Sequence, residues 1–496
     1  MSEPLVEAAE PEVEVPPQRR KKRWRVLGVL LVLLLGGLLY GWFAREQLAD
    51  TVIAGQMQDL GLPGTWQVES VGPGTQIISN IVIGDPARPD LTVKRVIVET
   101  TLHFGLPTID KVTLEEARLY GRYRDGTLSF GALDSVIFAK RDGQKGLPDL
   151  NLALVDGRAR VETDWGVIGA KAEGSGNLKS GFAGTLAMAG PQLAFGGCKA
   201  EQASAFGKVT TASGKARFDG PMRLQSLRCP AQALALGTST VQLTVELNET
   251  FDAAKGSYAL NTGAFGWQGY RAGKTEGKGD FAFAAGDLVA SYALTGSAVD
   301  LGGAGAGTLV LDGTLRSEDQ LTRFNGEGTI NGRNLRGGKA LIETLAGLET
   351  SGEGTLLAPL AKQIRAALAR EERGSSLRAD YTLRQTGGIT QVTLPFAELR
   401  GGTGARLLGL SKVAVALGMR GGPRFSGRFV TGGAGLPQME GVAERTGGGM
   451  TARFSLAEYR AGSSSVSLPD LRLVQLPGGQ IGFSGRALVS GPLPGG

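Results

Sequence analysis

Hydrophobic and polar residues alternate with a period of two through most of the chain beyond Thr65. The clearest run is VQLTVELN, where Val241, Leu243, Val245 and Leu247 share one face and polar side chains share the other. The same alternation recurs at Phe281 and Phe283, Tyr292 and Leu294, Leu309 and Leu311, Tyr381 and Leu383, Val392 and Leu394, and Val466 and Leu468. Because successive side chains of a strand point to opposite sides of a sheet, this pattern predicts strands with one apolar and one polar face.

Turn residues separate these runs. The pairs Asp125-Gly126, Asp156-Gly157, Asp312-Gly313 and Gly387-Gly388 tolerate positive φ and are typical of β-hairpins. Strands linked by hairpins predict a mainly β chain with antiparallel sheet over residues 65–337 and 374–496. As one sheet, about 25 to 30 strands spaced by about 4.8 Å would extend roughly 120 to 145 Å. A second sheet could cover the apolar face, or one sheet could curl upon itself, and the pattern does not distinguish these arrangements.

A helical insertion interrupts the strands at residues 338–373. Apolar residues recur there at helical spacing, first in ALIETLAGL and then in TLLAPLAKQIRAALAREE. The second run places Leu357, Leu360, Ile364 and Leu368 on one face, and Lys362, Arg365 and Arg370 on the other. The simplest interpretation is an amphipathic helix that covers part of the apolar sheet face. The alternatives are a helix along the sheet edge, a plug in an apolar groove, or a helix on a membrane surface.

The chain begins with a predicted membrane anchor at residues 19–44. Residues 26–44 carry no charge, and as a helix they would reach about 28 Å, enough to cross the hydrocarbon core of a bilayer. The side chains that mark the anchor are the basic Arg19, Arg20, Lys21, Lys22, Arg23 and Arg25 and the interfacial Trp24 and Trp42. The basic flank precedes the span, so the positive-inside rule predicts a single-pass inner-membrane protein with a cytoplasmic N-terminus and a periplasmic bulk.

A cleaved signal peptide is the alternative to this anchor. Trp42 and Phe43, however, occupy the place where its cleavage site needs small residues. Residues 1–18, rich in glutamate and proline, predict a disordered cytoplasmic tail. Residues 45–64 predict a short linker helix that ends at a Gly- and Pro-containing stretch.

Composition agrees with a folded, turn-rich chain. The sequence holds 78 glycines and is 42% hydrophobic, which is not the signature of disorder. Its net charge of +6 is not gathered into a basic cluster beyond the anchor, so nothing indicates nucleic acid binding. Cys198 and Cys229 are the only cysteines, and in an oxidising periplasm they can form a disulfide or remain two separate buried thiols.

The sequence offers little that could support catalysis. His103 is the only histidine and lies in a strand-like setting, and no nucleophile elbow, Walker loop or HExxH motif is present. We therefore predict no catalytic residue, no metal site and no cofactor, and a structural role for His103.

The apolar strand face is the best candidate for function. An open groove lined by this face would shield acyl chains from water, at about 0.8 kcal/mol per buried methylene. The candidate groove residues are Val241, Leu243, Val245, Leu247, Phe281, Phe283, Tyr292, Leu294, Leu309, Leu311, Val392 and Leu394. The competing interpretation is that the same side chains form a closed core, and alternation alone favours that interpretation.

Four segments that follow the anchor resemble a known family. In order they are Gly74–Gly84 (GTQIISNIVIG), Leu91–Val98 (LTVKRVIV), Ile109–Gly121 (IDKVTLEEARLYG) and Asp125–Asp134 (DGTLSFGALD). Together they are similar to the opening of the YdbH-like branch of the AsmA-like envelope proteins, and DGTLSFGALD is the most specific of them. The match is concentrated between Arg19 and Asp134.

This resemblance implies a long, taco-shaped β-groove, anchored in the inner membrane, that carries phospholipid across the periplasm towards the outer membrane. It supplies no catalytic residues. Members of the branch are considerably longer than this chain, which resembles their N-terminal half. A partner protein of the outer membrane or periplasm is then expected to complete the groove.

A function of another class stays open beside the groove. An envelope scaffold or assembly factor for outer-membrane proteins would use the exposed edge of the sheet to receive a client strand by β-augmentation.

Overall fold

The structure is a computed structural model that describes residues 55, 57–58, 61–72, 74–103, 106–137, 146–301, 304–355, 357–418, 422–446, 449–461, 463–475 and 481–491. The predicted tail, the anchor at residues 19–44 and most of the linker helix at residues 45–64 lie outside this set. Within it, no helix combines the length and the apolar character needed to span a membrane.

The chain divides into two compact units, Met1–Gly121 with Leu128–Lys145, and Arg122–Thr127 with Gly146–Gly496. The first contains β1 (Gly64–Val71), β2 (Thr75–Asp85), β3 (Arg88–His103), β4 (Leu106–Glu115), the 3-10 turn η2 (Gly131–Leu133) and α3 (Asp134–Ile137). Strands β5 (Arg118–Arg124) and β6 (Thr127–Ser129) contribute residues to both units.

The second unit contains the remaining elements. Its first strands are β7 (Asn151–Thr163), β8 (Gly166–Asn177), β9 (Ala183–Phe195), β10 (Cys198–Ala212), β11 (Lys215–Leu224), β12 (Ser226–Cys229), β13 (Leu234–Leu236), β14 (Ser239–Leu247), β15 (Ala253–Thr262), β16 (Phe265–Trp267), β17 (Tyr270–Ala272), β18 (Thr275–Ala284), β19 (Asp287–Asp300), β20 (Ala304–Glu318) and β21 (Arg323–Gly337), with the 3-10 turn η3 (Pro230–Gln232). After the helices α4 (Lys339–Ser351) and α5 (Leu357–Glu371) come β22 (Ser376–Thr386), β23 (Ile389–Arg400), β24 (Arg406–Leu417), β25 (Arg424–Thr431), β26 (Gln438–Thr446), β27 (Gly449–Ala461), β28 (Ser464–Ser467), β29 (Arg472–Gln475), β30 (Ile481–Ser484) and β31 (Leu488–Ser490). The predicted mainly β fold with a helical insertion is confirmed.

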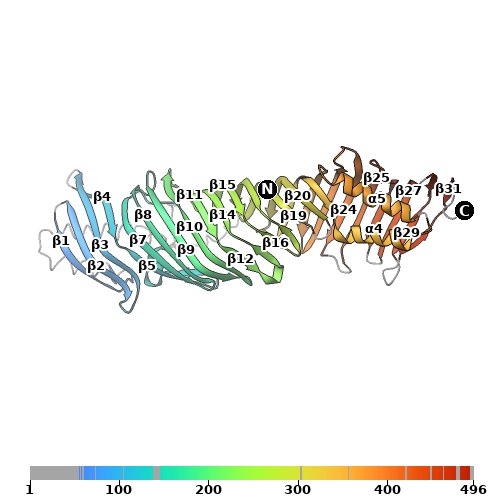
Figure 1. Ribbon diagram of the computed structural model, residues 1–496. Helices are drawn as coiled ribbons and strands as arrows, with labels where there is room; N and C mark the ends of the chain where they lie inside the picture. Colours follow the sequence, from blue (N-terminus) through green and yellow to red (C-terminus); the bar gives the residue numbers. More distant parts are fainter. Residues whose placement is uncertain are drawn as a thin grey trace, which may run out of the picture. The chain divides into compact units, whose positions relative to one another are not determined.

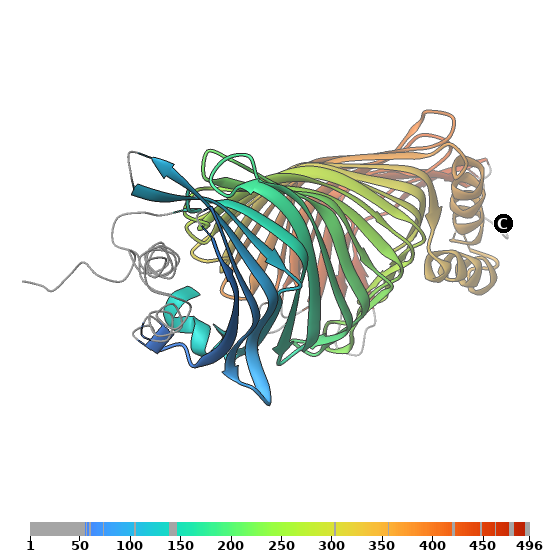
Figure 2. The same ribbon diagram turned by 90° about the vertical axis from the view of Figure 1, so that its left-hand side faces the viewer.

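The long strands of the second unit succeed one another laterally in an antiparallel order. β7 to β11 pair in sequence, β11 pairs with β14, β15 pairs with β18, and β18 to β27 again pair in sequence. The short strands β12, β13, β16 and β17 form their own ladder at one edge. The strands of this unit lie side by side in Figure 1, and Figure 2 shows that they are curved, so that the sheet of this unit is arched.

Large side chains on one face of this sheet lie over glycines of the neighbouring strand. A Cβ added to Gly256 on β15 would lie 3.0 Å from the ring atom Cζ of Phe281, and one added to Gly441 would lie 2.9 Å from that of Phe429. Ordinary contacts of a Cβ are longer, so the ring occupies the space that the glycine leaves open. The many glycines of the chain therefore serve the packing of strands as well as the turns.

Two of the four predicted hairpin turns are wrong. Asp125-Gly126 and Gly387-Gly388 do lie in turns, between β5 and β6 and between β22 and β23. Asp312-Gly313 lies instead within β20, because Gly313 gives room to the side chain of Tyr292. Asp156, with φ of 47°, stands at a register shift inside β7, where it forms a β-bulge rather than a turn.

The segment Asp125–Asp134, which carries the most specific resemblance, is held in place by side-chain contacts within the first unit. The Asp134 carboxylate accepts hydrogen bonds from the hydroxyl of Ser129 (2.5 Å) and the N–H of Phe130 (2.5 Å). The Phe130 ring lies over Gly121, where a Cβ would be 2.7 Å from its Cε1 atom. These contacts hold the turn between β6 and α3.

The insertion forms a helical hairpin fastened to turns of the sheet. Arg365 on α5 donates two hydrogen bonds to the carboxylate of Glu349 on α4, at 2.6 and 2.8 Å. At the end of α5 the buried Glu371 accepts hydrogen bonds from the N–H (3.1 Å) and the hydroxyl (2.8 Å) of Thr403 in the turn between β23 and β24. Gln363 and Arg370 bind carbonyls of the turn between β25 and β26. The helices therefore lie at the edge of the sheet where these turns are found.

We expect Gly328→Ala on β21 to destabilise the protein by about 1 to 3 kcal/mol, because its Cβ would collide with the carbonyl oxygen of Asp312. Gly326→Ala is the matched control, two residues away on the same face, where the nearest atoms are 3.5 Å from the new Cβ. Urea unfolding followed by circular dichroism measures both, and equal effects would contradict this account of the glycines.

Hydrogen bonds from Thr403 lower the pKa of Glu371 below its ordinary value of 4.5. The ionised Glu371 therefore stabilises the fold above pH 4.5, and this stabilisation is lost as the pH falls through the lowered pKa. We expect Glu371→Gln to lower the thermal midpoint at neutral pH and to lose less stability than the wild type on acidification. Glu353→Gln, at an exposed position between the helices, should behave as the wild type does.

Candidate functional site: an uncharged groove face

One face of the second unit bears a hollow of about 720 Å³. Three predicted groove residues, Val241, Leu243 and Phe281, line it. The other large apolar side chains of its wall come from β8 to β15, and they are Ile168, Met188, Leu193, Phe195, Met222, Leu224, Leu227, Leu236, Tyr258 and Leu260. Its polar lining residues are Ser204, Arg223, Ser239 and Thr262. We call the side of the sheet that carries these residues the groove face and the opposite side the outer face.

The strand register extends this apolar surface well beyond the hollow. Val241 lies opposite Met222 on β11 and Leu260 on β15, and the same row continues in both directions from strand to strand. From β7 to β27 its members are Ala159, Ala170, Met188, Ala205, Met222, Val241, Leu260, Gly277, Leu294, Leu311, Ile330, Ala379, Ala397, Leu410, Phe429, Gly441 and Phe454. No member of this row is charged or polar.

A second row runs parallel to the first and is apolar as far as Phe425, beyond which it reaches Arg445 on β26. It passes through Phe218, Val245, Gly256, Phe281, Ala290, Leu315, Gly326, Leu383, Val392, Val415 and Phe425. By register and alternation, all twelve predicted groove residues therefore lie on the groove face. Three of them line the hollow. Val392 borders a second hollow of about 390 Å³, but most of that lining, including Gln391, Arg424 and Glu444, comes from the outer face.

The large side chains of the groove face are only half-buried, whereas the small Ala205, Ala379 and Ala397 of the first row are buried. None of the twelve predicted residues is among the buried core residues, although most are Val, Leu or Phe. Met188 and Met222 in the first row are 37% and 41% exposed. A closed core would bury such side chains almost completely. The large side chains of this face are therefore less buried in the described structure than those of a closed core.

The outer face carries the charges. Lys255 on β15 pairs with Glu246 on β14 at 3.3 Å, and Lys171 on β8 lies 2.6 Å from Glu173. These side chains alternate with groove-face residues along the same strands, as the period of two predicted. The sheet therefore separates a largely apolar side from a charged one.

Three tyrosines lie across glycines on the floor of the groove face. The Tyr258 hydroxyl crosses Gly279 and donates a hydrogen bond to the carbonyl of Ser291, at 3.2 Å. Tyr292 and Tyr381 approach each other from β19 and β22 across Gly313 and Gly328, and their hydroxyls form a hydrogen bond. The hydroxyl groups thus have partners within the sheet, and the rings form part of the apolar floor.

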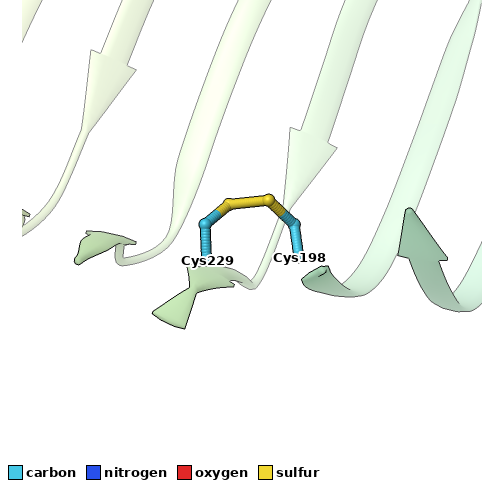
Figure 3. Close-up of a disulfide and its surroundings, with 2 residues drawn as sticks. All are labelled: Cys198 and Cys229. Carbon is cyan, nitrogen blue, oxygen red and sulfur yellow. A yellow bond between two sulfur atoms is a disulfide. The ribbon is translucent and has the colours of Figure 1, made fainter. Parts of the chain in front are cut away.

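The remaining predicted residues occupy other places. His103 is the last residue of β3 in the first unit. Cys198 and Cys229 form a disulfide between β10 and β12 (Figure 3). In the described part of the chain, no group of three or more His, Cys, Asp or Glu side chains is placed to hold a metal ion.

Sequence reasoning missed the part of the hollow built from β8 to β13. Met188 and Met222 lie in runs rich in alanine, glycine and arginine, where the alternation of large apolar residues is weak. Leu193, Leu227 and Leu236 follow irregularities of the strands. Their positions could be found only from the register, in which they join the groove face.

Comparison with known families assigns most of the chain. The family described as YdbH-like, intermembrane phospholipid transport protein YdbH, matches residues 32–494. No curated protein matches the chain.

Burial raises the pKa of Tyr381 above its ordinary value of 10.0, and the hydrogen bond with Tyr292 raises it further. The fold then favours the neutral phenol, so this stabilisation is present below pH 10.0 and is lost as the pH rises towards the raised pKa. We expect Tyr381→Phe to lose less stability than the wild type in alkaline solution, measured by thermal unfolding. Tyr120→Phe, at an exposed position, should leave the alkaline loss unchanged.

Proposed function

The chain belongs to the YdbH-like family of intermembrane phospholipid transport proteins, and on this premise we propose that its groove face carries phospholipid acyl chains, shielded from water, between the inner and outer membranes. The observation that supports the proposal most directly is the uncharged row from Ala159 to Phe454. Sixteen lateral steps at about 4.8 Å make a path of roughly 75 Å along the sheet. An acyl chain could move along this path without meeting a charge.

The energetics of such a path are favourable. Each methylene that leaves water for an apolar surface gains about 0.8 kcal/mol, so a half-enclosed groove recovers a large part of what a lipid loses on leaving a bilayer. The headgroup needs no place on the groove face, because the open side lets it remain in water. The function requires no covalent chemistry and no cofactor.

Residues 19–44 would hold the protein in the inner membrane with the sheet in the periplasm. The apolar length and basic flank of this segment support the assignment. In this arrangement the groove receives lipid from the membrane in which the chain is anchored. A protein of the outer membrane or periplasm would receive the lipid at the far end.

The assembly-factor function predicts a different ligand. Photo-crosslinkers at Leu243 and Val245 on the groove face would capture phospholipid if the groove carries lipid. Capture of outer-membrane polypeptides alone would favour a scaffold that binds client strands.

We expect Val245→Asp to reduce lipid transfer by about tenfold or more, because an acyl chain would have to pass a desolvated carboxylate. The measurement is transfer of a fluorescent phospholipid between donor and acceptor vesicles by the full chain.

Thr240→Asp is the matched control, on the outer face of the same strand and opposite Arg223. It should transfer lipid at the wild-type rate, and circular dichroism should show both variants folded. If Val245→Asp unfolds the protein, Val245 belongs to a closed core. If the folded variant transfers lipid normally, the groove face is not the path.

A further inference from the structure

The edge of the sheet beside the large hollow has an apolar lip on its groove side. The short strands β12, β13, β16 and β17 form this edge together with the ends of β9 and β10. Across them runs the row Phe195, Cys198, Cys229, Leu234, Trp267 and Tyr270, in which the disulfide joins the two cysteines. Phe195, Trp267 and Tyr270 are 41%, 46% and 42% exposed. Exposed aromatic rings of this kind suit a boundary between apolar material and water.

The outer side of the same edge carries two cations that face each other across a strand pair. Lys199 lies directly opposite Arg228 across β10 and β12, one residue from the disulfide on each strand. Among the described residues, no ion pair includes either cation. Glu201 lies two residues from Lys199 on this face, and its carboxylate accepts a hydrogen bond from the hydroxyl of Ser226 at 2.7 Å. Lys199, Arg228 and Glu201 together therefore keep one net positive charge. Both cations are exposed to solvent.

Two like charges in register across a strand pair disfavour that pairing. The disulfide Cys198–Cys229 holds the two strand ends together at this point (Figure 3), so the cations stay side by side in spite of their repulsion. An anionic phosphate placed between an ammonium and a guanidinium would reduce the repulsion and gain charge-assisted hydrogen bonds. The row continues from Arg228 through the small residues Ala235 and Gly266 to Arg271, which leaves the surface beside the pair open.

The cation pair adjoins the hollow on the other side of the edge. Ala200, next to Lys199, and Leu227, next to Arg228, both line the hollow, and so does Phe195 on the lip. A lipid whose acyl chains lie in the hollow could therefore extend its headgroup over the lip to the two cations.

We propose that Lys199 and Arg228 form a binding site for the phosphate of a glycerophospholipid whose acyl chains occupy the hollow. This inference rests on the proposed function and adds to it a recognition of phosphate at one position along the groove. The lip separates the two parts of the ligand, with acyl chains on the groove side and phosphate on the outer side.

The test compares two lipids that differ only in the phosphate. Photoactivatable phosphatidic acid and diacylglycerol with identical acyl chains are offered to the full chain in an uncharged detergent. We expect the wild type to bind phosphatidic acid about tenfold more tightly, as two solvent-exposed charge contacts would give. Lys199→Gln/Arg228→Gln should bind both lipids equally, with unchanged affinity for diacylglycerol.

The control removes two cations elsewhere on the outer face. Lys278→Gln/Arg316→Gln lies on β18 and β20, away from the edge, and should keep the tenfold preference. Equal binding of both lipids by the wild type would overturn the phosphate site while the proposed function stands. Binding of neither lipid by the wild type would instead contradict the proposed function.

A soluble phosphate ester is the other source of the same chemistry. Glycerol 3-phosphate should fail to displace phosphatidic acid from the wild type at a concentration equal to that of the lipid. Displacement at equal concentration would assign the site to a free phosphate ester and overturn its assignment to a lipid.

Discussion

The groove face depends on large side chains that lie flat over glycines of the next strand. Strands in a sheet are about 4.8 Å apart, so a ring can rest on its neighbour only where that neighbour has no Cβ. Phe281 over Gly256 and Tyr258 over Gly279 show this arrangement in adjacent strands. Because the rings lie along the sheet, they cover its backbone without filling the space in front of it. Side chains that projected away from the sheet would have filled this space.

This arrangement explains which features the sequence could predict. Alternation placed all twelve candidate residues on one face, since a period of two requires only that each strand stay extended. The helical insertion could likewise be predicted, because its apolar residues recur at a long and regular helical spacing. The pairs Asp312-Gly313 and Asp156-Gly157 were interpreted wrongly, because the same residues suit a turn, a β-bulge, or a strand position over which an aromatic ring packs. Only the neighbouring strand decides among these, and local sequence does not identify that neighbour.

The lateral rows were beyond sequence reasoning for a related reason. A row joins residues from as many strands as it crosses, and each register shift, such as the one at Leu154 and Gly157, changes its composition. The lip and the Lys199–Arg228 pair depend on β10 pairing first with β12 and then with β11. By contrast, the segment Asp125–Asp134 was informative about the family although its contacts serve the turn itself. A motif can therefore identify a family through residues that only maintain its fold.

A largely apolar face that stays half-exposed carries a free-energy cost that folding does not recover. Each 100 Å² of apolar surface left in water forgoes about 2.5 kcal/mol, and exposed apolar surface of this extent also favours aggregation. The protein keeps such a face although the outer side of the same strands carries charges, as Lys255 and Glu246 show. A ligand that covers the face would offset this cost whenever it is present. Acyl chains suit this role better than a client polypeptide, because a strand added at the edge would leave the groove face as exposed as before.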